Sequence, residues 1–170
     1  MTTPNTMKPG LPAQIGAWLF VLWGVLHVWV GAEGIHQYLT GGTSGLWNML
    51  IGGRAVSREA FVHVTDPVTL FAQGQLILNF CLDVGGYGVL GFFVAWLILR
   101  RASWTGYLIG LVAIGIADLA FLFALVVSGV IEFNAGTLGG PVLWFIAVII
   151  TPFGLPKVGA TTLRHARRAI

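Results

Sequence analysis

Charged residues and cysteine are both scarce in this sequence of 170 residues. Asp, Glu, Lys and Arg together make up 9% of the chain, whereas soluble domains carry about 25%. Apolar residues account for 56%. So few charges cannot cover a water-facing surface, and intrinsic disorder is excluded because it requires low hydrophobicity and high charge. A single cysteine, Cys81, excludes an intrachain disulfide and a cysteine-rich metal cluster. The composition predicts an integral membrane protein.

Recognisable catalytic and cofactor motifs are also missing. The sequence contains no P-loop, no dinucleotide-binding glycine fingerprint, no serine elbow and no zinc-binding His-Glu-x-x-His. No basic stripe with interleaved aromatics is present, so the net charge of +3 does not indicate nucleic-acid binding. We therefore expect no cofactor, no metal and no nucleic-acid partner, and the sequence leaves open whether the protein is an enzyme.

Four apolar stretches are long enough, or nearly so, to cross about 30 Å of hydrocarbon as helices. They cover residues 14–39, 69–99, 104–131 and 138–155, with an external loop at 40–66. The sequence thus predicts an all-α fold, an integral membrane four-helix transmembrane bundle at 14–158. A cytoplasmic segment at 1–13 precedes the bundle, and a basic cytoplasmic tail at 159–170 follows it.

The lysines and arginines indicate the orientation. Seven of them fall on one side of the predicted bundle and two, Arg54 and Arg58, on the other. The side with more basic residues is normally cytoplasmic, and an even number of spans puts both ends of the chain on one side. We expect the N and C termini in the cytoplasm and the protein in the cell (plasma or inner) membrane. The seven residues are Lys8, Arg100, Arg101, Lys157, Arg164, Arg167 and Arg168.

Local signals suggest where helices begin and how they pack. Asp66 and Ser103 are expected to cap the second and third spans, and the segment 139–141 (Gly-Gly-Pro) to open the fourth. The chain has 24 glycines, and small residues allow membrane helices to approach closely. In the third span a small-residue ridge is predicted at Gly106, Gly110, Ala113, Ala117, Ala120, Ala124 and Ser128.

Three ionisable residues lie deep within the predicted spans, where such groups are costly and suggest a function. His27, Asp83 and Asp118 each lie about thirteen or fourteen residues into a span, which places them near the midplane at 1.5 Å per residue. Gln75, Asn79 and Asp83 follow helical spacing and form a polar stripe. We expect His27, Asp83 and Asp118 to converge as one cluster, as candidate catalytic residues or as a structural clamp.

Further candidates for ligand binding are Gln75, Asn79, Trp23, Glu33 and His36. Glu33 and His36 form a single Glu-x-x-His pair near the external end of the first span. Di-iron helical bundles need two such pairs and two more carboxylates, so one pair does not predict a metal site. The external end is more typical of a solvated polar rim.

Three functions fit these observations. The first is a small binding or accessory subunit, whose midplane cluster fixes the bundle or holds a small lipophilic ligand. The second is a membrane-embedded acid–base enzyme, of the isomerase or cyclase type, that uses Asp83, Asp118 and His27 on a lipophilic substrate. The third is an oligomeric proton-coupled transporter or channel. The expected surroundings are the lipid bilayer, with a second copy, a larger membrane complex or a lipophilic small molecule as candidate partners.

Overall fold

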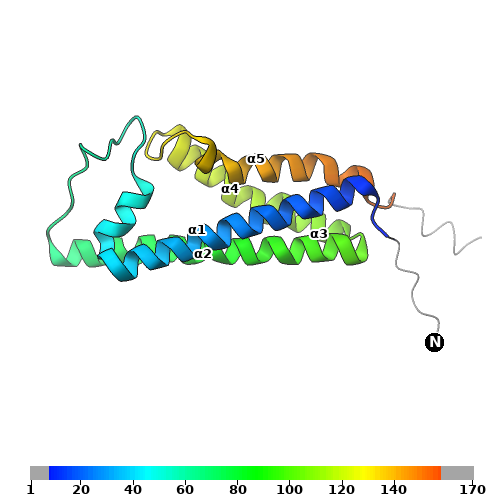
Figure 1. Cartoon of the computed structure of the whole chain (residues 1–170), viewed down its shortest axis with the longest axis horizontal. Helices are drawn as coiled ribbons and strands as arrows, with labels where there is room; N and C mark the ends of the chain where they lie inside the picture. The colour runs from blue at the N-terminus through cyan, green and yellow to red at the C-terminus, as the bar shows by residue number, and fades with distance from the viewer. Residues whose placement is uncertain (1–7, 158–170) are drawn as a thin grey trace, which may run out of the picture.

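The computed structural model describes residues 8–157, and every regular element within that range is helical (Figure 1). Helix α1 covers Leu11–Leu50, α2 covers Pro67–Arg101, and α5 covers Ala135–Ile150 with a 3-10 turn, η3, at Thr151–Gly154. The third span is continuous from Trp104 to Val127. It consists of α3 (Trp104–Ile109), η1 (Gly110–Ile114), α4 (Gly115–Phe121) and η2 (Leu122–Val127).

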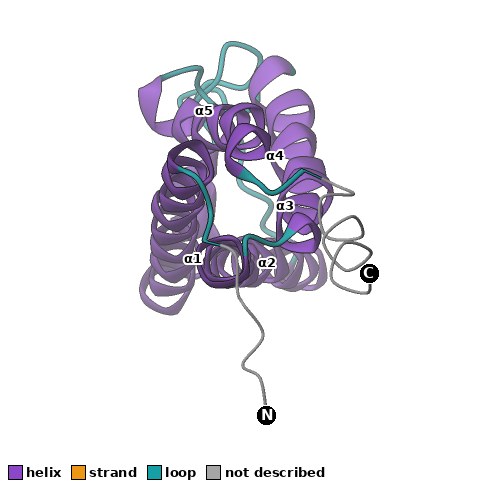
Figure 2. Ribbon diagram, turned by 90° about the vertical axis from the view of Figure 1, so that its right-hand side faces the viewer, coloured by secondary structure: helices purple, strands orange, loops and turns teal. Residues whose placement is uncertain are grey.

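Four of these helical stretches are long and apolar enough to cross a membrane. They are Leu11–Leu50, Pro67–Arg101, Trp104–Val127 and Ala135–Gly154. Seen along the helices, α1, α2, the third span and α5 surround a common centre (Figure 2). The second and third helices lie within a few residues of the apolar stretches at 69–99 and 104–131, whereas the first extends well beyond 39.

Side-chain caps determine where three of the helices begin. The carboxylate of Asp66 accepts a hydrogen bond from the backbone N–H of Thr69, and the hydroxyl of Ser103 accepts one from Gly106, as the sequence predicted. The fourth helix begins earlier than expected. Asn134 and Thr137 form a reciprocal capping box that starts α5 at Ala135, so the prediction that the segment 139–141 opens it is wrong.

The core lies at the contact between α1 and its neighbours. Phe20 and Trp23 of α1 are fully buried against Val94 of α2, Ile114 of the third span and other residues of α5. Glycines make the α1–α2 contact close: a Cβ at Gly24 would lie 2.7 Å from the carbonyl oxygen of Gly88. Packing through small residues is expected where lipid supplies no hydrophobic drive for helix association.

Helix α1 turns back on itself near its C-terminal end (Figure 1). Gly42 has φ 59° and ψ −153°, a conformation that residues with a Cβ rarely adopt, and the helix changes direction there. Residues 43–50 then continue as helix, and Leu46 is fully buried against Ile77 and Cys81 of α2. The first part of the segment 40–66, which was expected to be a loop, is therefore a folded extension of the first helix.

The third span contains two π-helical segments that change which residues face inward. Each wide turn accommodates an extra residue, so the buried positions recur about every four residues instead of every 3.6. The predicted ridge is buried at Gly106 and Gly110 and half-buried at Ala113 and Ala117, but it is wrong farther along, because Ala120 and Ala124 are exposed. The buried positions farther along are Ile114, Gly115, Asp118 and Val126.

The basic residues separate between the two ends of the bundle. Arg100 and Arg101 end α2 beside the beginning of the third span, and the backbone N–H of Gly10 donates to the carbonyl of Gly154 at the same end. Arg54 lies at the other end and donates to the carbonyl of Val127. Large apolar side chains are exposed on all four membrane-length helices. The predicted basic tail, with Arg164, Arg167 and Arg168, lies outside the described residues.

Candidate functional site

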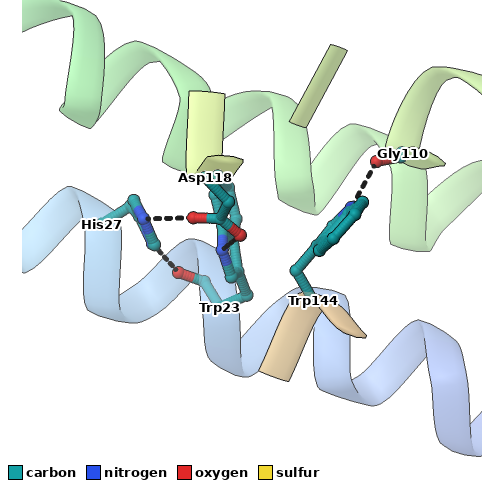
Figure 3. Close-up of polar contacts among 5 residues, drawn as sticks. All are labelled: Trp23, His27, Gly110, Asp118 and Trp144. Atoms are coloured by element: carbon teal, nitrogen blue, oxygen red, sulfur yellow. Dashed lines mark hydrogen bonds and ion pairs between the residues drawn. The ribbon is translucent and has the colours of Figure 1, made fainter. Parts of the chain in front are cut away.

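The side chains of Asp118 and Trp23 form a hydrogen bond in the interior of the bundle. Asp118 is only 2% exposed and Trp23 is fully buried. The indole Nε1–H of Trp23 donates to Oδ2 of Asp118 over 2.8 Å, which links α1 to the third span (Figure 3). Asp118 reaches this position because the π segment before it turns it inward. A hydrogen bond to a buried carboxylate is strong, and losing either partner leaves an unpaired polar group in an apolar interior.

His27 completes the cluster from the next turn of α1. Its ring stacks on the Trp23 ring with centroids 3.7 Å apart, and its Nδ1 lies 2.8 Å from the carbonyl oxygen of Trp23. Its Nε2 lies 3.6 Å from Oδ1 of Asp118. Trp23, His27 and Asp118 are hereafter called the polar clamp, and Figure 3 shows that all three side chains point toward one another.

Two contacts orient the ring of His27 within the polar clamp. A carbonyl oxygen can only accept, so the Nδ1 of His27 carries a hydrogen that it donates to Trp23. The Nε2 of His27 then faces Oδ1 of Asp118.

Close packing from α5 encloses the polar clamp. Gly140 has no room for a side chain, because a Cβ there would lie 2.7 Å from Cε1 of His27 and 3.5 Å from Oδ1 of Asp118. One turn along α5, Trp144 donates from Nε1 to the carbonyl of Gly110 over 3.0 Å and packs against Gly115 (Figure 3). The side chain of His27 is 17% exposed. The cluster therefore resembles a packed inter-helix contact more than an open cavity.

Asp83 does not join this cluster, and the expected convergence of three residues is wrong on this point. Its side chain is exposed on α2, where Oδ2 accepts from Asn79 Nδ2 over 2.9 Å. The α1-facing side of α2 consists instead of small residues such as Gly88 and Gly91. Helical spacing correctly places Asn79 and Asp83 on one stripe, but at these two positions the stripe is exposed. Gln75, on the same stripe, donates to the hydroxyl of Tyr38 on α1.

The candidates at the external end do not form a common site. Glu33 accepts a hydrogen bond from Gln37 over 2.6 Å, and His36 is exposed. His63 packs edge-on against Phe61. Among residues 8–157 no three His, Cys, Asp or Glu side chains are grouped so that they could hold a metal ion.

Sequence reasoning missed two features of the site. The indole N–H of Trp144 donates to the carbonyl at the start of η1, and a buried tryptophan generally requires such a partner. Gly140 was assigned to the start of the fourth span, yet it makes the room that His27 needs. Two adjacent glycines, Gly139 and Gly140, would have indicated a close contact with another helix if they had been predicted to lie within the fourth helix.

Comparisons with protein-family models, curated protein sequences and solved structures gave no significant match. The function is therefore inferred from the residues and their contacts alone.

Proposed function

We propose that the protein is a small integral membrane protein of the cell membrane that acts as an accessory subunit, with both ends of its chain in the cytoplasm. In this proposal the polar clamp of Trp23, His27 and Asp118 fixes the helices in place and performs no catalytic step. The observation that carries the proposal is the burial of Asp118 at 2% exposure, with one carboxylate oxygen bonded to Trp23 and the other facing His27.

The energetics of such a contact support a structural role. Polar contacts between membrane helices stabilise a bundle by about 0.6–2 kcal/mol each. The clamp joins α1 to the third span, and Gly140 brings α5 against the same atoms. A reaction centre needs space for a substrate beside its acid and base, whereas a Cβ at Gly140 would already be too close to His27.

The surface and the charges support the membrane location and orientation. Large apolar side chains such as Trp29, Phe93, Phe123 and Phe145 are exposed on the four spans, which a lipid environment accommodates. Seven of the nine basic residues in the sequence lie on the predicted cytoplasmic side.

The acid–base enzyme is the less well supported alternative. An enzyme of this kind requires Asp83 and Asp118 to contact the same substrate, one as the acid and the other as the base. Asp83 is exposed on α2, however, whereas Asp118 is buried against Trp23. A transporter or channel would need several copies of the chain, because four helices from one chain rarely enclose a pore.

Two substitutions at Asp118 separate a clamp from a catalytic group. Asp118→Asn keeps an oxygen for the Trp23 N–H and offers an amide N–H to Nε2 of His27, so we expect an unfolding midpoint close to that of the wild type. Asp118→Leu leaves the indole N–H unpaired, which costs about 1–3 kcal/mol and lowers the midpoint by about 3–10 °C. The measurement is thermal unfolding in detergent micelles.

The matched control is Thr105→Leu, which places leucine at an exposed polar position of the same span and is expected to leave the midpoint unchanged. Unfolding of Asp118→Leu at the wild-type temperature would contradict the clamp. Loss of a measurable turnover in Asp118→Asn with full stability would instead support the enzyme.

A further inference from the structure

The exposed side of α2 carries a second polar group, which the polar clamp does not use. Asn79 and Asp83 lie one turn apart, followed by Gly86 and Tyr87, and all four are exposed. These four residues are called the α2 polar face. Leu82 and Leu90 flank them and line, with Asp83, Gly86 and Tyr87, a shallow open depression of about 270 Å³. Other exposed side chains in the middle of α2 include the apolar Leu76, Val89 and Phe93.

The hydrogen bonding of the α2 polar face is incomplete. Asn79 donates one amide hydrogen to Oδ2 of Asp83. Within residues 8–157, the second oxygen of Asp83, the second amide hydrogen of Asn79 and the hydroxyl of Tyr87 make no hydrogen bond. Asp83 lies sixteen residues from Pro67 and eighteen from Arg101, so it is about 25 Å from either end of α2 at 1.5 Å per residue. A carboxylate facing lipid at that depth is costly, and such groups generally face protein.

We infer that the α2 polar face is the interface through which a second copy of this chain binds. The inference rests on the proposed membrane location. The face carries donors and acceptors side by side, so it is complementary to itself. Two copies in one membrane share an orientation, and a two-fold axis along the membrane normal brings the same residues together at the same depth. Because the amide of Asn79 already reaches the carboxylate of Asp83 one turn away, its free hydrogen lies at the depth of that carboxylate and can bond the free carboxylate oxygen of the other copy's Asp83.

The shape of the face fits a second α2 helix. Gly86 has open space where a Cβ would stand, so two helices can approach closely one turn beyond Asp83. Close approach at a small residue beside reciprocal polar contacts is the usual way in which membrane helices pair. The shallow depression between Leu82 and Leu90 receives the apolar side chains of the other copy on both sides of the polar contacts.

Cysteine cross-linking in membranes tests this interface. In the full chain with Cys81→Ala, which removes the only cysteine, Gly86→Cys is expected to form a disulfide-linked dimer under mild oxidation. Ala120→Cys is the matched control, because it is an exposed small residue of the third span, and it is expected to stay monomeric. Adding Asn79→Leu and Asp83→Leu to Gly86→Cys is expected to weaken dimerisation about tenfold or more, measured as energy transfer between labelled chains in liposomes.

A monomeric Gly86→Cys variant, equal cross-linking at Ala120→Cys, or dimerisation unaffected by the two leucines would overturn the inference. Cross-linking of Gly86→Cys to a different membrane protein, with no dimer, would also overturn it. Extraction by alkaline carbonate tests the proposed membrane location separately from the proposed interface. A chain that stays in the membrane without dimerising contradicts only the interface, whereas a chain released by carbonate contradicts the proposed membrane protein itself.

Discussion

At the residue scale, burial separates the two deep carboxylates. Both lie in apolar helices, and the sequence predicts a similar depth in the membrane for the two. The structure buries Asp118 against Trp23 and His27 and leaves Asp83 exposed beside Asn79. That His27 and Asp118 would meet could be predicted, because an ionisable group in an apolar span needs a partner. Which side of α2 faces α1 could not, because both of its sides carry glycines and apolar residues.

Gly140 gives the sharpest steric test of the polar clamp. Gly140→Ala forces a methyl group against the ring of His27, where the Cβ would lie 2.7 Å from Cε1, and we expect a loss of about 1–3 kcal/mol in the free energy of unfolding. Gly139→Ala is the matched control, because its nearest neighbour would be Leu26 at 3.5 Å. Equal stability of the two variants, measured by reversible unfolding in micelles, would contradict the packing described for His27.

The stability of the first turn of α2, which Asp66 caps, is expected to depend on pH. Hydrogen bonds from the hydroxyl and the backbone N–H of Thr69 lower the pKa of the Asp66 carboxyl below its ordinary value of 3.8. Since the folded-state pKa is the lower one, the cap stabilises the helix fully above about pH 4 and is lost as the pH falls through the lowered pKa. We expect the amide hydrogen exchange of Thr69 to accelerate over that acidic range.

Thr69→Val tests the cause of this lowered pKa, because it removes the hydroxyl donor and keeps the backbone one. The pKa of Asp66, followed by NMR, is expected to rise toward 3.8 in this variant. An unchanged pKa would show that the Thr69 hydroxyl does not contribute.

At the scale of elements, two departures from regular helix position the site. The π segment η1 turns Asp118 inward, and the turn at Gly42 sends residues 43–50 back onto α2. The caps at Asp66 and Ser103 were predictable because the acceptor and the helix start are adjacent in sequence. The π segments were not, because an extra residue in a helical turn depends on packing against Trp144 and Phe20, which are distant in sequence.

Gly42 is expected to tolerate substitution far less well than its neighbour. Its φ of 59° with ψ of −153° costs about 1–3 kcal/mol for a residue with a Cβ, so Gly42→Ala should loosen the segment 43–50. Gly41→Ala is the control, because a Cβ there meets no atom within 4 Å. Protease cleavage after Trp47 and hydrogen exchange in this segment measure the effect. Equal protection in both variants would contradict the fold-back.

At the scale of the whole molecule, the four-span, all-helical architecture follows from the apolar runs, and the structure contains four helices of sufficient length. The number and approximate position of these helices were predictable because each run is long and contains at most one acidic residue and no lysine or arginine. The length of α1 was not, because glycine-rich residues 40–45 resemble a loop and become helical only through the burial of Leu46. The polar clamp then joins α1 and the third span, while Gly140 of α5 packs against it, so its loss should affect the bundle as a unit.

A double-mutant cycle between Trp23 and Asp118 tests the clamp most directly. Trp23→Phe, Asp118→Ala and the double variant are unfolded reversibly in micelles, and the free energies of unfolding are compared with the wild type. The direct hydrogen bond of 2.8 Å predicts a coupling energy of about 1 kcal/mol or more, because the second substitution costs little once the first has broken the contact. Additive effects, within about 0.3–0.5 kcal/mol, would mean that the two side chains do not hold the bundle together.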